Sequence, residues 1–146
     1  MDKAVASRFC NVIAPAVRTC LYVEDSEANL MLVQQLVARR DDVKLLSATS
    51  GLRGVEMAQD EHPDVIMMDI NLPGLSGLEA LRLLRADPST ARTPISAVSS
   101  NAYPKQIEEC LREGFFRYLT KPFKLDEFNK AIDDMLLYSN KIRRIR

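Results

Sequence analysis

Long apolar runs and an excess of either charge are both absent from this sequence. Its apolar stretches fall far short of the roughly 20 residues that a membrane-spanning helix requires, and no compact apolar block of the signal-peptide kind opens it. Its 20 lysines and arginines equal its 20 aspartates and glutamates. The charge therefore gives no reason to expect nucleic acid or an anionic membrane as a partner, and we expect a cytoplasmic protein.

Histidine and cysteine are also scarce. The single histidine, His62, precedes Pro63 and is interpreted as a solvated turn residue, which disfavours a histidine-kinase or histidine-phosphotransfer role for this chain. The three cysteines, Cys10, Cys20 and Cys110, are odd in number and widely spaced, a pattern typical of reduced thiols. No two are close enough to suggest metal ligation. Cys20 and Cys110 lie in apolar patterns and are predicted to be core residues.

The length of 146 residues suits one domain. Residues 1–18 show no clear period and are expected to be an N-terminal arm or the remnant of a linker, whereas 141–146 are expected to form a basic tail. Residues 19–140 alternate short apolar runs with helical periods. Expected strands cover 20–23, 43–48, 65–68, 95–98 and 117–119. This pattern predicts an α/β fold: a doubly wound, five-stranded parallel sheet of order 2-1-3-4-5 with five helices, as in flavodoxin.

Three of the expected helices have a readable apolar face. The helix over 27–40, with Ser26 as its N-cap, is predicted to bury one stripe of side chains: Ala28, Met31, Leu32, Gln35 and Leu36. The last helix shows the cleanest period, with five apolar residues on one side: Leu125, Phe128, Ile132, Met135 and Leu136. The helix after Pro104 is predicted to place Ile107, Cys110, Leu111 and Gly114 on one stripe.

Polar side chains follow four of the five strands, at the point where each strand ends. Glu24 and Asp25 follow the first strand, Asp69 the third, Ser99 the fourth and Lys121 the fifth. The carboxyl ends of parallel strands lie on one edge of a sheet, where open α/β sheets place their ligands. These side chains are therefore predicted to converge.

Three converging carboxylates repel one another, at a cost of roughly 3 kcal/mol per pair at 5 Å and an effective dielectric constant near 20. A divalent cation relieves that repulsion, and an all-oxygen site suits Mg²⁺, with Mn²⁺ as a substitute. Lys121 supplies the balancing charge and can hold a phosphoryl oxygen, as can the Ser99 hydroxyl. An aspartate in such a site can act as a nucleophile toward a phosphoryl group.

Four segments in order resemble the receiver domain of two-component response regulators. They read Val23-Glu24-Asp25; Pro63-Asp64-Val65-Ile66-Met67-Met68-Asp69-Ile70-Asn71-Leu72-Pro73-Gly74-Leu75-Ser76-Gly77; Val98-Ser99-Ser100-Asn101-Ala102; and Tyr118-Leu119-Thr120-Lys121-Pro122-Phe123. The resemblance covers about residues 19–138. Segments 71–77 and 115–123 look similar to receivers attached to hybrid sensor kinases. The chain is expected to be either a stand-alone receiver or one cut from a larger protein, such as the C-terminal receiver of a hybrid sensor kinase.

The resemblance implies a role for each site residue. Asp69 is the phosphoacceptor, and Mg²⁺ is held by Glu24, Asp25, Asp69 and the backbone carbonyl of Asn71. Lys121 binds the phosphoryl group, and the Lys121–Pro122 bond is cis. Ser99 and Tyr118 are the switch residues.

The resemblance also implies the partners. A histidine kinase or histidine-phosphotransfer protein donates the phosphoryl group. The face formed by the fourth helix, fifth strand and fifth helix, about residues 104–137, then binds a downstream protein or a second copy. The chain is accordingly expected to be a signalling switch rather than an enzyme, catalysing only its own phosphorylation and dephosphorylation. Glu24 stands where many relatives have Asp, and its longer arm suits contact with the metal through a water. Ser99 replaces the commoner Thr and keeps the hydroxyl.

Each of these residues has a plain alternative explanation when taken alone. Asp25 can begin a helix, Asp69 can be a turn residue, and Lys121 can be a solvated loop residue; only the joint pattern argues against these interpretations. Two other functions are disfavoured by particular residues. A phosphohydrolase with an aspartyl-phosphate intermediate is disfavoured because Asn71 stands where such enzymes place an acid. A flavin or nucleotide binder is disfavoured because Glu24 and Asp25 replace a glycine-rich phosphate loop.

Overall fold

The computed structural model describes residues 17–145, with side chains to residue 142. The strands are β1 (Arg18–Val23), β2 (Val43–Ala48), β3 (Val65–Asp69), β4 (Ile95–Ser99) and β5 (Tyr118–Thr120). The helices are α2 (Glu27–Ala38), α3 (Gly51–Glu61), α4 (Gly77–Ala86), α5 (Pro104–Glu113) and α6 (Leu125–Ile145). Within these residues no helix is both long and apolar enough to cross a membrane.

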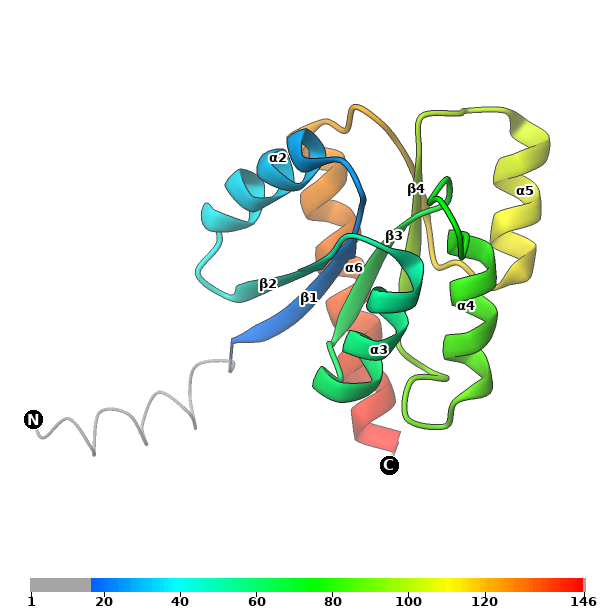
Figure 1. Ribbon diagram of the computed structural model, residues 1–146. Coiled ribbons are helices and arrows are strands. Elements are labelled where there is room, and N and C mark those ends of the chain that lie inside the picture. Colours follow the sequence, from blue (N-terminus) through cyan, green and yellow to red (C-terminus); the bar gives the residue numbers. More distant parts are fainter. Residues whose placement is uncertain (1–16, 146) are drawn as a thin grey trace, which may run out of the picture.

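The five strands form one parallel sheet in the order β2-β1-β3-β4-β5, which confirms the predicted fold. Helices α2 and α6 cover one face of the sheet, and α3, α4 and α5 cover the other (Figure 1). Side chains alternate between the two faces along each strand. In β1, Cys20 and Tyr22 face α2 and α6, whereas Leu21 and Val23 face the opposite helices.

The predicted stripe of α2 was wrong except for Leu36, because Ala28, Met31, Leu32 and Gln35 are exposed. The buried residues of this helix are Leu30, Val33, Leu36 and Val37, while Met31 is 59% exposed. The segment is apolar on more than one side, so its sequence offers two stripes of helical spacing, and packing against the sheet and α6 selects one. Ser26 is the N-cap as predicted, because its side chain accepts a hydrogen bond from the Asn29 N–H.

The apolar stripe of α6 is confirmed, whereas that of α5 is not. Phe128, Ile132 and Met135 are buried in the core beneath the sheet. In α5 only Cys110 is buried, and Leu111 remains 46% exposed. Cys20 and Cys110 are both buried free thiols, as predicted, whereas Cys10 lies outside the described residues.

Several element ends differ from the predicted ones. Asp69 and Ser99 are the last residues of β3 and β4 rather than the first residues of the following loops. Helix α6 continues to Ile145, through most of the segment 141–146 that we expected to form a separate tail. No glycine or proline follows Pro122, so the sequence contains nothing that would end the helix earlier.

Arg18 connects the start of β1 to Asp64, the residue before β3, and to α6. Its Nη2 lies 3.0 Å from Asp64 Oδ1, in an ion pair with most of both side chains buried. The same guanidinium donates to Ser139 Oγ at 3.1 Å and to Asn140 Oδ1 on α6. Arg18 was expected to belong to the N-terminal arm of residues 1–18, but it is the first residue of β1; residues 1–16 of that arm lie outside the described part of the chain.

Candidate carboxylate and metal site

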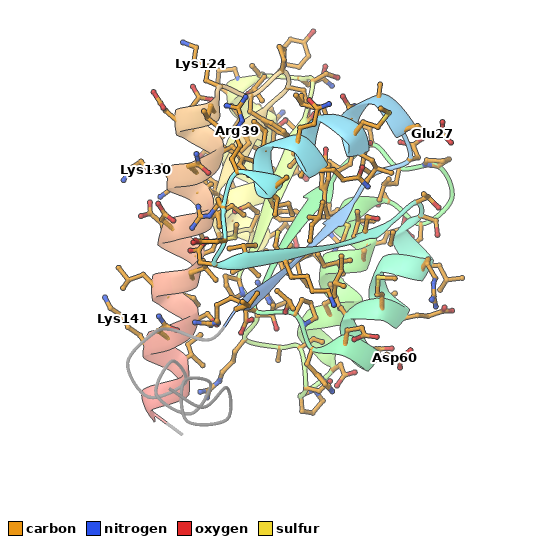
Figure 2. All side chains as sticks on the ribbon, turned by 90° about the vertical axis from the view of Figure 1, so that its left-hand side faces the viewer. Glu27, Arg39, Asp60, Lys124, Lys130 and Lys141 are labelled. Carbon is orange, nitrogen blue, oxygen red and sulfur yellow. The ribbon has the colours of Figure 1, made fainter. Side chains whose placement is uncertain are left out.

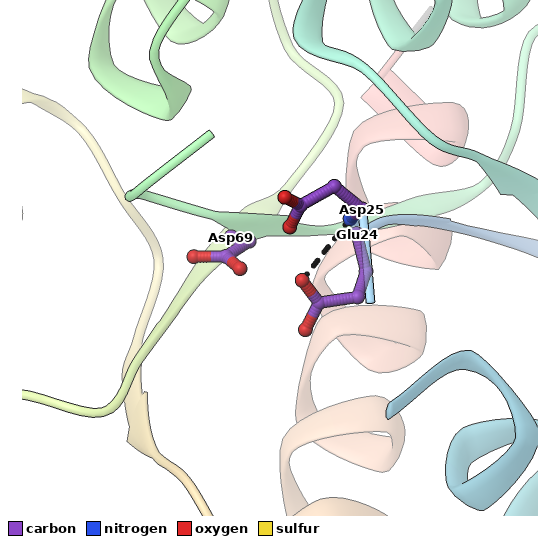
Figure 3. A group of neighbouring side chains, drawn as sticks. All are labelled: Glu24, Asp25 and Asp69. Atoms are coloured by element: carbon purple, nitrogen blue, oxygen red, sulfur yellow. Dashed lines mark hydrogen bonds between the residues drawn. The ribbon is translucent and has the colours of Figure 1, made fainter. Parts of the chain in front are cut away.

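Three carboxylates converge at the carboxyl edge of the sheet, as the strand-end pattern predicts. Glu24 and Asp25 follow β1, and Asp69 ends β3; one ligand oxygen from each lies within 4.8 Å of the others (Figure 3). Glu24 and Asp69 are buried, whereas Asp25 is exposed. The group is thus open to solvent on the Asp25 side, which gives an ion a route to the two buried carboxylates.

Two other acidic residues that lie near Asp69 in sequence are placed elsewhere. Asp64 precedes β3 and pairs with Arg18. Asp60 lies near the end of α3, at the opposite edge of the sheet from Glu27, which begins α2 (Figure 2). The convergence is therefore specific to residues at the carboxyl ends of strands.

Lys121 bridges the two buried carboxylates. Its Nζ lies 2.8 Å from Asp69 Oδ2 and 2.5 Å from Glu24 Oε1. The lysine follows β5, and the Lys121–Pro122 peptide bond is cis, as the resemblance implies. This bridge confirms that residues from β1, β3 and the end of β5 come together, and it places a cation beside Asp69.

The close contacts shift the pKa values of Glu24, Asp69 and Lys121. Burial and the neighbouring Glu24 carboxyl raise the pKa of Asp69, although Lys121 and the Asn71 N–H oppose this. Burial also disfavours ionised Glu24, but its contacts with Asp69 and Lys121 outweigh burial and hold the pKa of Glu24 below its usual value. Burial alone would lower the pKa of Lys121, but the contacts with Asp69 and Glu24 outweigh burial and hold this pKa above its usual value.

Glu24 has two further partners that the sequence analysis missed. The Tyr22 hydroxyl and the Asn29 side-chain amide each donate to Glu24 Oε1 at 3.0 Å. Strand alternation could have placed Tyr22 on the same face as Glu24, because the two are separated by one residue. No sequence signal indicates that Asn29 turns from α2 toward this carboxylate.

Ser99 and Asn71 lie beside the carboxylates and contact each other. The Asn71 N–H donates to Asp69 Oδ1 at 2.9 Å, and its side-chain amide donates to Ser99 Oγ at 3.2 Å. Ser99 Oγ also accepts from the Asn101 N–H at 3.1 Å. Tyr118 lies farther out, and its hydroxyl donates to the Asn101 carbonyl at 2.6 Å.

The residues present fit a hard divalent cation. All the available ligands are oxygens, which Mg²⁺ prefers. Three acidic side chains face one lysine, so the ionised group carries an excess of negative charge. Glu24 Oε1 already accepts from Tyr22, Asn29 and Lys121, so Asp25 and Asp69 are the carboxylates with more room for direct ligation.

Fold and site together define a receiver domain, and the family comparison agrees. Residues 20–133 match the family model for the response regulator receiver domain. The chain belongs to this family, whose members work in two-component signalling and interact with kinases or phosphotransfer proteins.

Named relatives and solved structures support the same assignment. The chain is 32% identical over 119 residues to the polar-differentiation response regulator DivK of Brucella ovis, covering 82% of this chain and 96% of the relative. It resembles the receiver domain of sensor histidine kinase PA1611 from Pseudomonas aeruginosa, whose structure has a magnesium ion in the active site cleft: TM-score 0.75, 31% identity, 83% of this chain and 98% of that one. Vibrio cholerae chemotaxis protein CheY4 gives a TM-score of 0.77 at 26% identity, with 83% of this chain and all 100% of that chain covered.

Proposed function

We propose that Asp69 is the phosphoacceptor of this receiver domain. The bridge from Lys121 Nζ to Asp69 Oδ2 is the observation that carries the proposal, because it places a cation where charge must be stabilised during transfer. Asp69 is also the carboxylate of the three that both ends a central strand and contacts the lysine. An oxygen of Asp69 attacks the phosphorus of a phosphohistidine, an O–P bond forms, and the P–N bond breaks. The imidazole nitrogen keeps that electron pair and takes a proton from solvent.

We infer that Mg²⁺ binds beside Asp69. Asp25, Asp69 and the Asn71 backbone carbonyl would hold it, with Glu24 contributing through its less occupied oxygen, Oε2, or through a water. The cation, when bound, neutralises charge on the carboxylates and on the transferring phosphoryl oxygens. Mn²⁺, also a hard cation, should substitute. Lys121 and Ser99 would contact phosphoryl oxygens, and Asn71, which cannot transfer a proton, favours slow loss of the phosphate to water over enzymatic turnover.

The proposed partners follow from this chemistry. A histidine kinase or a histidine-phosphotransfer protein would be the donor, in the cytoplasm, as the sequence predicts. The face formed by α5, β5 and α6 would change on phosphorylation and would bind a downstream protein or a second copy. Tyr118 supports this choice because it belongs to β5 and contacts the loop after Ser99.

Labelling with a radioactive phosphodonor tests the proposal. The chain should take up label from acetyl phosphate or from a phosphorylated histidine kinase only when Mg²⁺ is present. Asp69→Asn should abolish uptake, whereas Asp60→Asn, the same change at the opposite edge of the sheet, should leave it unchanged. Label retained by Asp69→Asn would refute the assignment.

A further inference from the structure

Tyr22 is a buried tyrosine whose hydroxyl meets a charged group of the site. Its side chain belongs to the core between the sheet and helices α2 and α6, and the residue is fully buried. Tyr22 and Glu24 face the same side of the strand, so the ring of Tyr22 brings its hydroxyl to Glu24 Oε1, 3.0 Å away. Asn29 reaches the same oxygen from the first turn of α2, also at 3.0 Å.

The two oxygens of Glu24 are in different situations. Oε1 accepts from Tyr22, Asn29 and Lys121, whereas Oε2 accepts from the Asp25 N–H at 3.1 Å. A carboxylate oxygen with three donors has little capacity for another partner. Glu24 is therefore fixed with Oε1 toward the lysine and Oε2 toward the open side of the carboxylate group.

We propose that Tyr22 and Asn29 are positioning residues for phosphorylation: they hold Glu24 so that its carboxylate aims Lys121 at Asp69. This inference rests on the proposed function of Asp69. A buried carboxylate with Lys121 as its main partner would lose that partner as soon as the ammonium moved to a phosphoryl oxygen. The hydroxyl and the amide keep Glu24 satisfied and in place throughout, so Lys121 can shift between Glu24 and the phosphoryl group while Glu24 stays still.

Groups that orient a site residue commonly change activity by 10- to 100-fold when removed. Tyr22→Phe removes the hydroxyl and keeps the ring, so the core packing is preserved. We expect the rate of Asp69 phosphorylation by acetyl phosphate, at saturating Mg²⁺, to fall roughly tenfold. The Mg²⁺ dissociation constant should change much less, because Asp25 and Asp69 are untouched. Tyr138→Phe makes the same chemical change on α6, next to Phe116, and should leave the rate unchanged.

The decisive measurement is a double-mutant cycle with Glu24→Gln. If Tyr22 acts through the Glu24 carboxylate, Tyr22→Phe should have little further effect on the rate in the Glu24→Gln background. An equal loss in both backgrounds, or a wild-type rate for Tyr22→Phe alone, would overturn the inference. If Tyr22→Phe fails to fold, Asn29→Ala tests the inference in its place, because Asn29 donates to the same oxygen of Glu24. Absence of label on the wild-type chain would overturn the proposed function as well; normal labelling with an unresponsive Tyr22 would overturn only the positioning role.

Discussion

Ser99 and Tyr118 contact opposite ends of one residue. Asn101 donates its N–H to Ser99 Oγ at 3.1 Å, and its carbonyl accepts from the Tyr118 hydroxyl at 2.6 Å. Movement of the Ser99 hydroxyl toward a phosphoryl oxygen would remove the partner of the Asn101 N–H. The displaced loop would then release Tyr118, so Asn101 would connect the two side chains that we propose form the switch.

Ser99→Ala should allow phosphorylation of Asp69 but weaken the structural change across residues 104–137 that we propose follows it. The variant keeps Asp69, Lys121 and the acidic residues, so it should still accept phosphate, but it lacks the hydroxyl that we propose draws the loop inward. We expect weak changes in amide chemical shifts across residues 104–137 on adding beryllofluoride, a phosphoryl mimic. Ser99→Thr, which keeps the hydroxyl, is the matched control. A full wild-type shift pattern in Ser99→Ala would disprove the coupling.

Metal affinity should depend on the two adjacent acidic residues to different extents. Asp25→Asn removes an exposed carboxylate, and we expect Mg²⁺ affinity to fall at least about tenfold, or ~1.4 kcal/mol. Glu24→Gln should cost less, because Glu24 Oε1 is already engaged by three donors. Titration calorimetry gives both values, with Glu27→Gln, an exposed change in α2, as control. Equal affinity in Asp25→Asn and the wild-type chain would remove Asp25 from the metal site.

Lys121→Met should make stability depend more strongly on the metal. Glu24 and Asp69 would lose the cation that they share, and breaking a buried pair typically costs 3–5 kcal/mol. Because the Lys121 side chain is 17% exposed, we expect a smaller loss, about 2 kcal/mol, in urea unfolding without Mg²⁺. Added Mg²⁺ should raise the stability of this variant more than that of the wild-type chain. The same Mg²⁺ response in both proteins would contradict the bridging role.

Much of this site could be predicted because the sheet imposes a simple rule. Parallel strands bring their carboxyl ends together, so Glu24, Asp69 and Lys121 could be placed from strand positions alone. The hydrogen-bond partners of those residues were harder to predict. Asn29 reaches Glu24 through the orientation of α2 against the sheet, and Asn101 contributes through its backbone, which carries no sequence signal.

The fold could likewise be predicted in part: the order of the strands was correct, whereas the buried faces of two helices were not. The order of strands follows from alternating strand and helix segments and the preference for right-handed crossovers. The buried face of α2 did not follow, because this helix carries apolar residues on more than one side. In α5 the apolar residues do form one stripe, but only Cys110 of that stripe is buried. Leu30 and Val33 of α2 are selected by packing with α6, a helix almost a hundred residues later in the chain, and a local period cannot report such a contact.

Cys20 should make the chain sensitive to alkali. Burial, opposed only partly by Arg40, raises the pKa of its thiol to about 12. In the unfolded chain the thiol ionises near pH 8.5. The unfolded state therefore binds fewer protons between these two values, and the contribution of Cys20 to stability is complete below about pH 8.5 and is lost as the pH rises toward 12.

The corresponding experiment compares the wild-type chain with Cys20→Ala. The variant lacks the thiol, so the stability difference between the two proteins should narrow by about 2 kcal/mol between pH 8.5 and pH 10.5. Urea unfolding at both pH values measures that difference. A constant difference would show that the Cys20 thiol does not resist ionisation in the folded protein.

The Arg18 contacts have a mechanical consequence. One guanidinium joins the first residue of β1 to Asp64 ahead of β3 and to Ser139 and Asn140 on α6. A pull on the backbone ahead of Arg18 would therefore be transmitted through this side chain to α6 as well as along β1. Helix α6 is part of the face that we propose changes on phosphorylation, so tension arriving at the start of the sheet and phosphate arriving at its far edge would act on the same helix.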